Sequence, residues 1–177
     1  MNNFQRKIFF EIHSGNTREG PGSFKSTKKA FSYLTSLPNM PNILDAGCGP
    51  GKQTLDLASI SNRKITEFDN YQPFLDNLSQ KVKSLNLDNR ITVLNMDMFN
   101  LKLDESIFDL IWSEGSIYII GLEKGFKEWK KHLKPGGYFA ASHICWLKEN
   151  QPAELYDFWK DAYPTITDIK TNLSAIE

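Results

Sequence analysis

The sequence lacks three features that would indicate a secreted scaffold, a membrane protein or a nucleic-acid-binding protein. Only two of its 177 residues are cysteines, Cys48 and Cys145, too few for a disulfide framework or a cysteine-rich zinc site. No apolar run is long enough to span a bilayer. The 21 lysines and arginines balance the 21 aspartates and glutamates, so no excess charge would attract nucleic acid or an anionic membrane.

The N-terminus also lacks the apolar middle of a signal peptide, because charged and polar side chains interrupt residues 1–12. We therefore expect a cytoplasmic, reduced protein with a small-molecule partner and no metal. What the chain does have is 40% hydrophobic and 12% aromatic residues, enough for a sizeable core. Its length of 177 residues predicts a single domain over residues 1–177.

Strand-like and helical patterns alternate along most of the chain. Strands are predicted at residues 42–46, 64–69, 91–96, 108–112 and 138–145. Helices are predicted at residues 3–12, 52–60, 121–133 and 152–162, from Ser23 or Ser26 to Pro38 and Pro41, and from Pro73 onward. Such alternation indicates an α/β fold with a doubly wound, mostly parallel sheet and helices on both faces. In such folds ligands bind beyond the carboxyl ends of the strands.

A glycine-rich turn follows the first predicted strand, and three nucleotide-binding motifs compete for it. A P-loop would need glycine where Ala46 stands and a hydroxyl where Gln53 stands. A dinucleotide fingerprint would need a third glycine where Lys52 stands. The third motif, Gly-x-Gly-x-Gly after an acidic strand end, is matched at every glycine by Asp45-Ala46-Gly47-Cys48-Gly49-Pro50-Gly51. In this respect the sequence resembles the class I S-adenosylmethionine-dependent methyltransferases, small-molecule type, of a bacterial subgroup.

The resemblance, which spans roughly residues 42–144, implies S-adenosyl-L-methionine as the cofactor and several residues that hold it. The turn supplies Asp45, Gly47, Cys48, Gly49 and Gly51, and the end of the second strand supplies Asp69, with Asn70 beside the adenosine. A carboxylate has two acceptor oxygens, which suit the two ribose hydroxyls. Asp69 could instead be an N-cap of the helix near Pro73, and Glu67, two residues earlier on the same side of the strand, is the second choice for the ribose.

Further cofactor contacts are implied after the third and fourth strands and in the N-terminal segment. Asp97 would reach the adenine amino group, and Met98 and Phe99 would enclose the ring. Glu114 would contact the methionine amino group or the substrate, and Arg18, in an arm that folds over the cofactor, would pair with its carboxylate. The candidates for a general base are Glu114, Tyr118 and His143, and the pattern assigns none of them.

The regions around the core follow from the same resemblance. Residues 1–40 would form N-terminal helices and the cofactor-covering arm, residues 42–146 the cofactor-binding core, and residues 147–177 a C-terminal helix and tail. The family has seven strands, the last two in an antiparallel hairpin, whereas this chain has five by Cys145 and too few residues after it for another helix and that hairpin. Either the chain is truncated, which would put its activity in doubt, or a partner chain such as a second copy closes the edge.

The predicted function is transfer of a methyl group to a small-molecule acceptor by in-line displacement. The fourth strand ends in Ser113-Glu114-Gly115-Ser116 rather than in the Asn/Asp-Pro-Pro-Tyr/Phe typical of enzymes that methylate nucleobases. Two alternatives stay open. One is a module that binds S-adenosylmethionine without transferring its methyl group. The other is an NAD-dependent oxidoreductase, which the lysine at position 52 disfavours.

Overall fold

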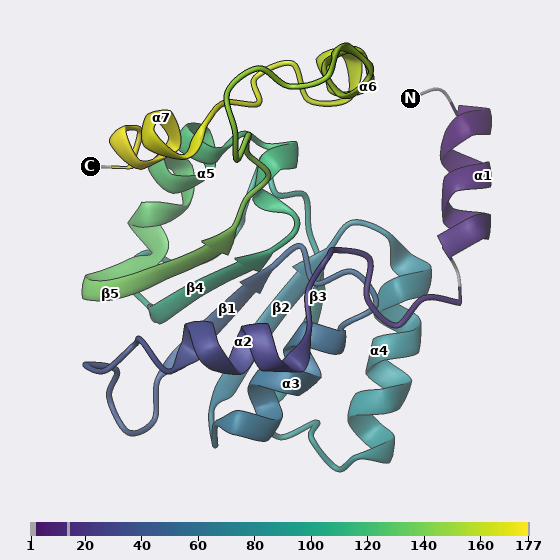
Figure 1. Cartoon of the computed structure of the whole chain (residues 1–177). Coiled ribbons are helices and arrows are strands. Elements are labelled where there is room, and N and C mark those ends of the chain that lie inside the picture. Colours follow the sequence, from purple (N-terminus) through teal and green to yellow (C-terminus); the bar gives the residue numbers. More distant parts are fainter. Residues whose placement is uncertain (1–2, 14, 177) are drawn as a thin grey trace.

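The computed structural model describes residues 3–13 and 15–176 and contains one five-stranded parallel sheet with strand order β3-β2-β1-β4-β5. Its strands are β1 (Asn42–Ala46), β2 (Lys64–Asp69), β3 (Ile91–Asn95), β4 (Phe108–Glu114) and β5 (Leu133–Ser142). All neighbouring strands pair in parallel, so their carboxyl ends meet at one edge of the sheet (Figure 1). Because the strand order reverses at β1, a ligand crevice is expected between the ends of β1 and β4.

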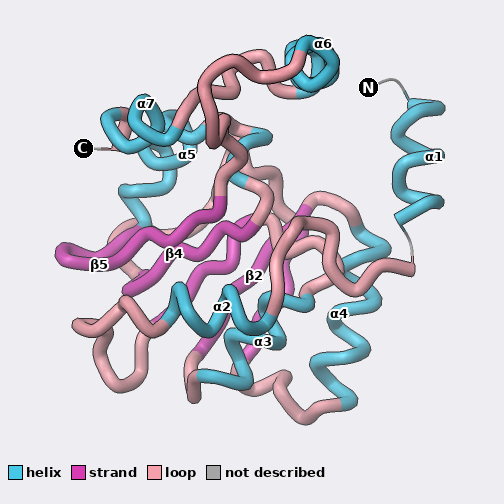
Figure 2. Tube along the Cα trace, in the orientation of Figure 1, coloured by secondary structure: helices cyan, strands magenta, loops and turns pink. Residues whose placement is uncertain are grey.

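Helices cover both faces of this sheet, which confirms the predicted doubly wound class. The helices are α1 (Asn3–His13), α2 (Phe24–Phe31), α3 (Lys52–Ile60), α4 (Gln72–Ser84), α5 (Leu122–Trp129), α6 (Ala153–Ala162) and α7 (Ile169–Ser174), with short 3-10 helices η1 (Ile117–Ile119) and η2 (Lys130–His132). Helices α2, α3 and α4 lie on one face and α5 on the other, while α6 and α7 lie near the carboxyl ends of the strands (Figures 1 and 2). Within the described ranges, no helix is long and apolar enough to cross a membrane.

Two hydrophobic cores lie on opposite faces of the sheet because successive strand residues point to opposite sides. Ile43 and Ile65 pack with α3 and α4 on one face, whereas Leu44 and Phe68 pack with Trp129 of α5 on the other. All five of these side chains are at most 1% exposed. The rigid double-sided core fixes the strand ends that carry the site.

The second helix is shorter than the sequence predicts. We expected it to continue to Pro38 and Pro41, but α2 ends at Phe31. The hydroxyl of Ser32 donates to the carbonyl of Lys29 at 2.7 Å, and the next two amides bond three residues back rather than four. A serine at this position offers the backbone an alternative to the helix, so the prolines are not what ends it.

The last strand also differs from its predicted range. It begins at Leu133 and ends at Ser142, so residues 134–137, predicted as a separate turn, lie inside it. The pairing with β4 jumps from Leu133 to Tyr138, and Gly136 at φ 76° lies within this bulge. The preceding helix ends at Trp129 instead of Leu133, while β4 extends two residues past its predicted end to Glu114.

The segment after β5 contains a helix that the sequence analysis did not predict. Asp168 caps α7 by accepting from the backbone N–H of Thr171 at 2.9 Å. An isolated parallel bridge joins Trp146 to Asp168 just beyond the end of β5. Among the described residues no further strand pairs with the outer edge of β5, as Figure 2 shows for the strand at the margin of the sheet.

Candidate active site

The turn between β1 and α3 lies over the end of β2. Gly47, Gly49 and Gly51 have φ values of 74°, 53° and 82°, which residues with a side chain rarely adopt. The amides of Gly47 and Cys48 both donate to the carbonyl of Phe68 at 3.0 Å, and the amide of Gly49 donates to the Asp69 carboxylate at 3.0 Å. The predicted glycine turn and the predicted carboxylate at the end of β2 are therefore in direct contact.

Asp69 holds two segments of backbone at once. Its second oxygen accepts from the amide of Tyr71 at 2.9 Å, just before α4 begins at Gln72. Each carboxylate oxygen retains a further lone pair for a ligand. Asp69 thus fixes the turn and the start of α4 while its carboxylate stays on the surface of the cavity described next.

A cavity of about 210 Å³ runs along the carboxyl ends of β3, β2, β1 and β4. Nine of the residues predicted from the sequence line it: Gly47, Cys48, Gly49, Asp69, Asn70, Met98, Phe99, Glu114 and Tyr118. Its wall also includes Phe9 and Phe10 of α1, Glu19 and Gly20 of the N-terminal arm, and Ser116. Three distant parts of the chain therefore meet at the predicted strand-end edge.

Asp45 supports the turn from below and does not line the cavity. It is fully buried and accepts from the hydroxyl of Thr54 at 2.6 Å, which ties β1 to α3. Burial raises the pKa of Asp45 to about 7, against the opposing effect of that hydrogen bond. Gln53 adds a second support, since its side-chain amide donates to the carbonyl of Cys48 at 2.7 Å. Asp45 therefore holds the turn from inside the protein, and Gln53 holds it from a position that also lines the cavity.

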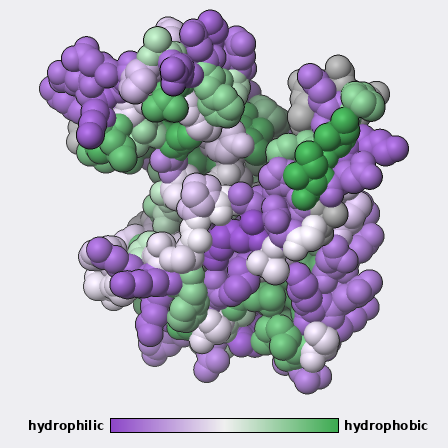
Figure 3. All heavy atoms as spheres, turned by 45° about the vertical axis from the view of Figure 1, so that its right-hand side comes forward, coloured by the Kyte–Doolittle hydropathy of each residue, from purple (hydrophilic) through white to green (hydrophobic). Residues whose placement is uncertain are grey.

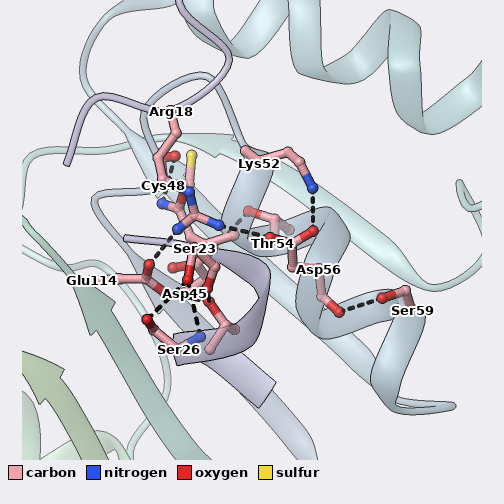
Figure 4. A network of polar contacts seen from close by, with 12 residues as sticks. Arg18, Ser23, Ser26, Asp45, Cys48, Lys52, Thr54, Asp56, Ser59 and Glu114 are labelled. Atoms are coloured by element: carbon pink, nitrogen blue, oxygen red, sulfur yellow. Dashed lines mark hydrogen bonds and ion pairs between the residues drawn. The ribbon is translucent and has the colours of Figure 1, made fainter. Parts of the chain in front are cut away.

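Arg18 lies between two acidic side chains (Figure 4). It is not among the residues that line the cavity. One guanidinium nitrogen contacts Glu114 at the end of β4, and the other lies 2.6 Å from Asp56 of α3. Glu114 accepts in addition from the hydroxyl of Thr27 at 2.9 Å and from the indole N–H of Trp112 at 3.3 Å. Both oxygens of Glu114 are therefore occupied, and Arg18 joins the arm of residues 15–22 to the sheet.

Replacing Arg18 with methionine is expected to lower the free energy of unfolding by about 1–2 kcal/mol, because mostly buried carboxylates lose a charged partner. The side chains of Asp56 and Glu114 are only 5% and 9% exposed. Urea unfolding measures the change, and chymotrypsin should cut faster at Phe24, just after the arm. The matched control is Lys160→Met, which removes an ion pair whose lysine is 50% exposed and should change stability little. Equal effects of the two variants would contradict the arm's attachment through Arg18.

Glu67, the second choice for the ribose contact, is a buried carboxyl group two residues before Asp69 on β2 and does not line the cavity. It is 0% exposed, and neither of its oxygens has a hydrogen-bond partner within the described part of the chain. Burial raises its pKa to about 8, and the nearby thiol of Cys48 opposes that rise. Burial also raises the pKa of Cys48 well above its ordinary value. Both groups are therefore protonated at neutral pH, next to the glycine turn.

The Glu67 carboxyl group makes stability depend on pH. Its pKa rises from 4.5 to about 8 on folding, so its stabilising effect is complete below pH 4.5 and is lost as the pH rises through 8. Replacing Glu67 with glutamine should flatten the decline in the free energy of unfolding over this range by on the order of 2–4 kcal/mol. Denaturation at a series of pH values tests this, with the exposed Glu105→Gln as control. Parallel pH curves for the wild type and the Glu67 variant would show the prediction to be wrong.

His143 does not line the cavity. Its Nε2 lies 3.2 Å from the hydroxyl of Tyr163, and that ring packs edge-on against Tyr118, which does line the cavity. Burial lowers the pKa of His143, which favours its neutral form. Of the three candidate bases, Tyr118 and Glu114 reach the cavity wall, and Glu114 is already occupied by Arg18 and two other donors.

Two other predicted contacts also lie outside the cavity wall. Asp97 accepts from the amide of Phe99 at 2.9 Å and is exposed, so it shapes the turn that presents Met98 and Phe99. Gly51 packs against Leu78 of α4 instead of the cavity. Both residues support the backbone of the site without lining the cavity. A linear motif does not distinguish such supporting residues from those that contact the ligand.

Sequence reasoning missed several residues that complete the site. Ser116 donates its hydroxyl to the carbonyl of Ala46 at 2.6 Å and lies where a side chain on Gly47 would project. Glu19 and Gly20 reach the cavity from the N-terminal arm. The glycine-rich composition of residues 15–22 predicted a loop, and the family resemblance implied an arm that contacts the cofactor through Arg18 rather than through Glu19 or Gly20.

Comparison with known proteins agrees with this geometry. The family model described as "Methyltransferase domain" matches residues 43–137. The sterol 4-C-methyltransferase strm-1 of Caenorhabditis elegans is 31% identical over 142 residues, 75% of this chain and 42% of that protein. The sterol 24-C-methyltransferase ERG6 of Saccharomyces cerevisiae is 27% identical over 111 residues, 62% of this chain and 29% of that protein. The chain thus spans less than half the length of these curated relatives.

Solved structures share the fold. A SAM-dependent methyltransferase from Geobacter sulfurreducens, in complex with S-adenosyl-L-homocysteine, superposes with a TM-score of 0.82 at 18% identity and covers 96% of this chain and 68% of its own. Geranyl diphosphate C-methyltransferase from Streptomyces coelicolor A3(2) gives a TM-score of 0.72 at 17% identity, covering 99% of this chain and 64% of its own. At these identities the likeness establishes the fold, including the strand order on which the site depends.

Proposed function

Because the chain belongs to the methyltransferase domain family, we propose that its cavity binds S-adenosyl-L-methionine and that the protein transfers the methyl group to a small-molecule acceptor. The observation that carries the proposal is the contact between the amide of Gly49 and the carboxylate of Asp69, which lies beside the crevice between β1 and β4 where the strand order reverses. This contact places the ends of β1 and β2 around one elongated cavity. The neighbours solved with S-adenosyl-L-homocysteine support the choice of cofactor.

The residues present fit this cofactor. A side chain on Gly49 would come within 3.7 Å of Glu19 across the arm, so glycine keeps that part of the cavity open. Asp69 and Asn70 would hold the ribose and the adjoining adenosine, and Met98 and Phe99 would flank the adenine. Cys48 and the glycines of the turn would lie beneath the methionine part, with Asp45, Gly51 and Asp97 holding the backbone of the site in place.

Positioning is the main task of the protein in this reaction. When bound, S-adenosylmethionine supplies an electrophilic methyl group: the acceptor's electron pair forms the new bond as the carbon–sulfur bond breaks, and the breaking pair stays on sulfur. Holding the acceptor in line can supply up to roughly 7–11 kcal/mol. Tyr118 lines the cavity and would wall the acceptor, with Tyr163 and His143 packed behind it. Glu114 would fix the arm through Arg18.

Exposed apolar side chains on α1, whose Phe9 and Phe10 line the cavity, and on α6 support an apolar acceptor. Phe4 and Ile12 on α1 are 70% and 73% exposed, and Figure 3 shows hydrophobic atoms along this end of the chain. On α6, Tyr156 and Phe158 are 59% and 65% exposed. The relatives named for sterols and the neighbour named for geranyl diphosphate suggest the same class of compound.

The proposal extends to the setting of the reaction. Residues 1–177 would act as one unit in which the N-terminal arm covers the cofactor, residues 42–146 bind it and residues 147–177 flank the acceptor. The balanced charge supports a chain that binds neither nucleic acid nor an anionic membrane, and two unpaired cysteines suit the cytoplasm. The outer edge of β5, which no strand of the described residues covers, leaves room for a homodimer contact.

A turnover assay tests the proposal. The protein is incubated with methyl-labelled S-adenosylmethionine and a panel of sterol, isoprenoid and small polar acceptors, and S-adenosylhomocysteine is measured. We expect transfer to at least one apolar acceptor. Binding of the cofactor without transfer to any acceptor would favour the non-catalytic module, and displacement of S-adenosylmethionine by NAD would favour the oxidoreductase.

A further inference from the structure

Glu19 lies in the cavity wall between the ends of β1 and β4. Its Cγ is 3.7 Å from the position of a side chain built on Gly49, in the turn after β1. The next residue, Gly20, faces Gly115 after β4 so closely that a side chain on Gly20 would lie 3.3 Å from the Gly115 Cα. The arm thus places the Glu19 carboxylate over the crevice where the strand order reverses.

Among the described residues, one oxygen of this carboxylate has a hydrogen-bond partner and the other has none. Oε2 contacts Nδ1 of His13 at the end of α1. Oε1 is buried and has no hydrogen-bond partner among residues 3–13 and 15–176. A buried acceptor left unsatisfied is unfavourable, and more so when it is charged. In a ligand cavity, such an oxygen indicates a donor that the ligand brings.

The charges around the cavity specify a cationic donor. Glu19 and Asp69 both line it, and no lysine or arginine is among its described lining residues. Arg18, the arginine of the arm, already forms ion pairs with Asp56 and Glu114. The predicted pairing of Arg18 with a carboxylate of the cofactor would require it to leave both of these buried partners.

We propose that Glu19, through Oε1, accepts the ammonium group of the amino-acid end of the cofactor. The inference rests on the proposed function, which places the adenosine near β2 and β3 and leaves the amino-acid end at β1 and β4. Asp69 and Glu19 then hold opposite ends of one elongated ligand. Arg18 is a positioning residue that keeps Glu19 over the crevice.

Calorimetric titration with two ligands tests this contact. S-adenosylhomocysteine carries the amino-acid end, whereas 5′-methylthioadenosine has the same adenosine and thioether without it. Replacing Glu19 with glutamine keeps the shape of the side chain and removes its charge. The substitution should weaken the binding of S-adenosylhomocysteine by about 10-fold or more and leave the affinity for 5′-methylthioadenosine within twofold of the wild type. Equal affinity of variant and wild type for S-adenosylhomocysteine, or equal loss for both ligands, would overturn the assignment.

Two control variants separate the contact from the structure of the arm. His13→Gln removes the partner of Oε2 and should leave S-adenosylhomocysteine binding within about threefold of the wild type, as should the exposed Glu105→Gln. A loss in His13→Gln as large as in Glu19→Gln would assign the effect to the arm and contradict a direct contact. If the wild type binds neither ligand, the proposed function fails as well; if it binds both and Glu19→Gln changes neither, only this inference fails.

Discussion

Replacing Asp69 with asparagine is expected to weaken the binding of S-adenosylhomocysteine by about 100-fold or more. A hydrogen bond to a charged group contributes about 1.5–3 kcal/mol, and the carboxylate would accept from two ribose hydroxyls. A loss of roughly 3 kcal/mol already corresponds to about 100-fold in affinity. In the wild type, the backbone amides of Gly49 and Tyr71 donate to the two oxygens of Asp69. Asparagine has only one oxygen, so its NH2 group would face one of these amide donors and that hydrogen bond would be lost.

Calorimetry measures this effect against a matched substitution. Asp88→Asn makes the same chemical change at an exposed position after α4 and should leave the affinity within about twofold. Circular dichroism establishes that the Asp69 variant is folded before binding is compared. If the Asp69→Asn protein is folded and binds S-adenosylhomocysteine as tightly as Asp88→Asn does, Asp69 does not contact the ribose.

Replacing Gly51 with alanine is expected to lower the free energy of unfolding by about 2–5 kcal/mol. Its φ of 82° costs a residue with a side chain roughly 1–2 kcal/mol. The new methyl group would also lie 2.7 Å from Cγ of Leu78 and closer still to its end carbons, and Leu78 is 0% exposed, so its side chain would have to shift within the core. Such overpacking adds about 1–3 kcal/mol, and the displaced turn would carry Gly49 away from Asp69.

A second glycine separates the two causes. Gly136, in the bulge of β5, has a φ of 76°, but a side chain built there meets nothing within 4 Å. Gly136→Ala should therefore cost only the roughly 1–2 kcal/mol of backbone strain. Urea unfolding of both variants gives the difference. Similar losses in the two proteins would mean that contact with Leu78 is not what requires glycine at position 51.

The sequence was sufficient for those parts of the fold that depend on local patterns. Alternating strand and helix signals predicted the five strands and the doubly wound class because each segment's periodicity reflects the face that it buries. The glycine turn was predictable because its positive φ values restrict the residue types. The place of Asp69 at the end of β2 followed from counting along one strand.

The remaining features depend on contacts between distant parts of the chain. Arg18 and Glu114 are separated by 96 residues, and no local pattern shows that they form an ion pair. Whether Glu19 or Arg18 faces the ligand depends on the path of the arm over the sheet. His143 was expected near the site because it lies towards the end of the predicted fifth strand, but its side chain turns toward Tyr163, which belongs to a segment that the motif did not include.

An amide-resolved NMR titration with S-adenosylhomocysteine tests the central claim most directly, because it reports both binding and its location. Saturable shifts are predicted at Gly47, Gly49, Asp69, Met98 and Gly115, which follow the cavity from β3 to β4. The groove between α2 and β5, lined by Ala30 and Ala140, should be unaffected. No shifts at millimolar ligand, or shifts confined to that groove, would contradict the account.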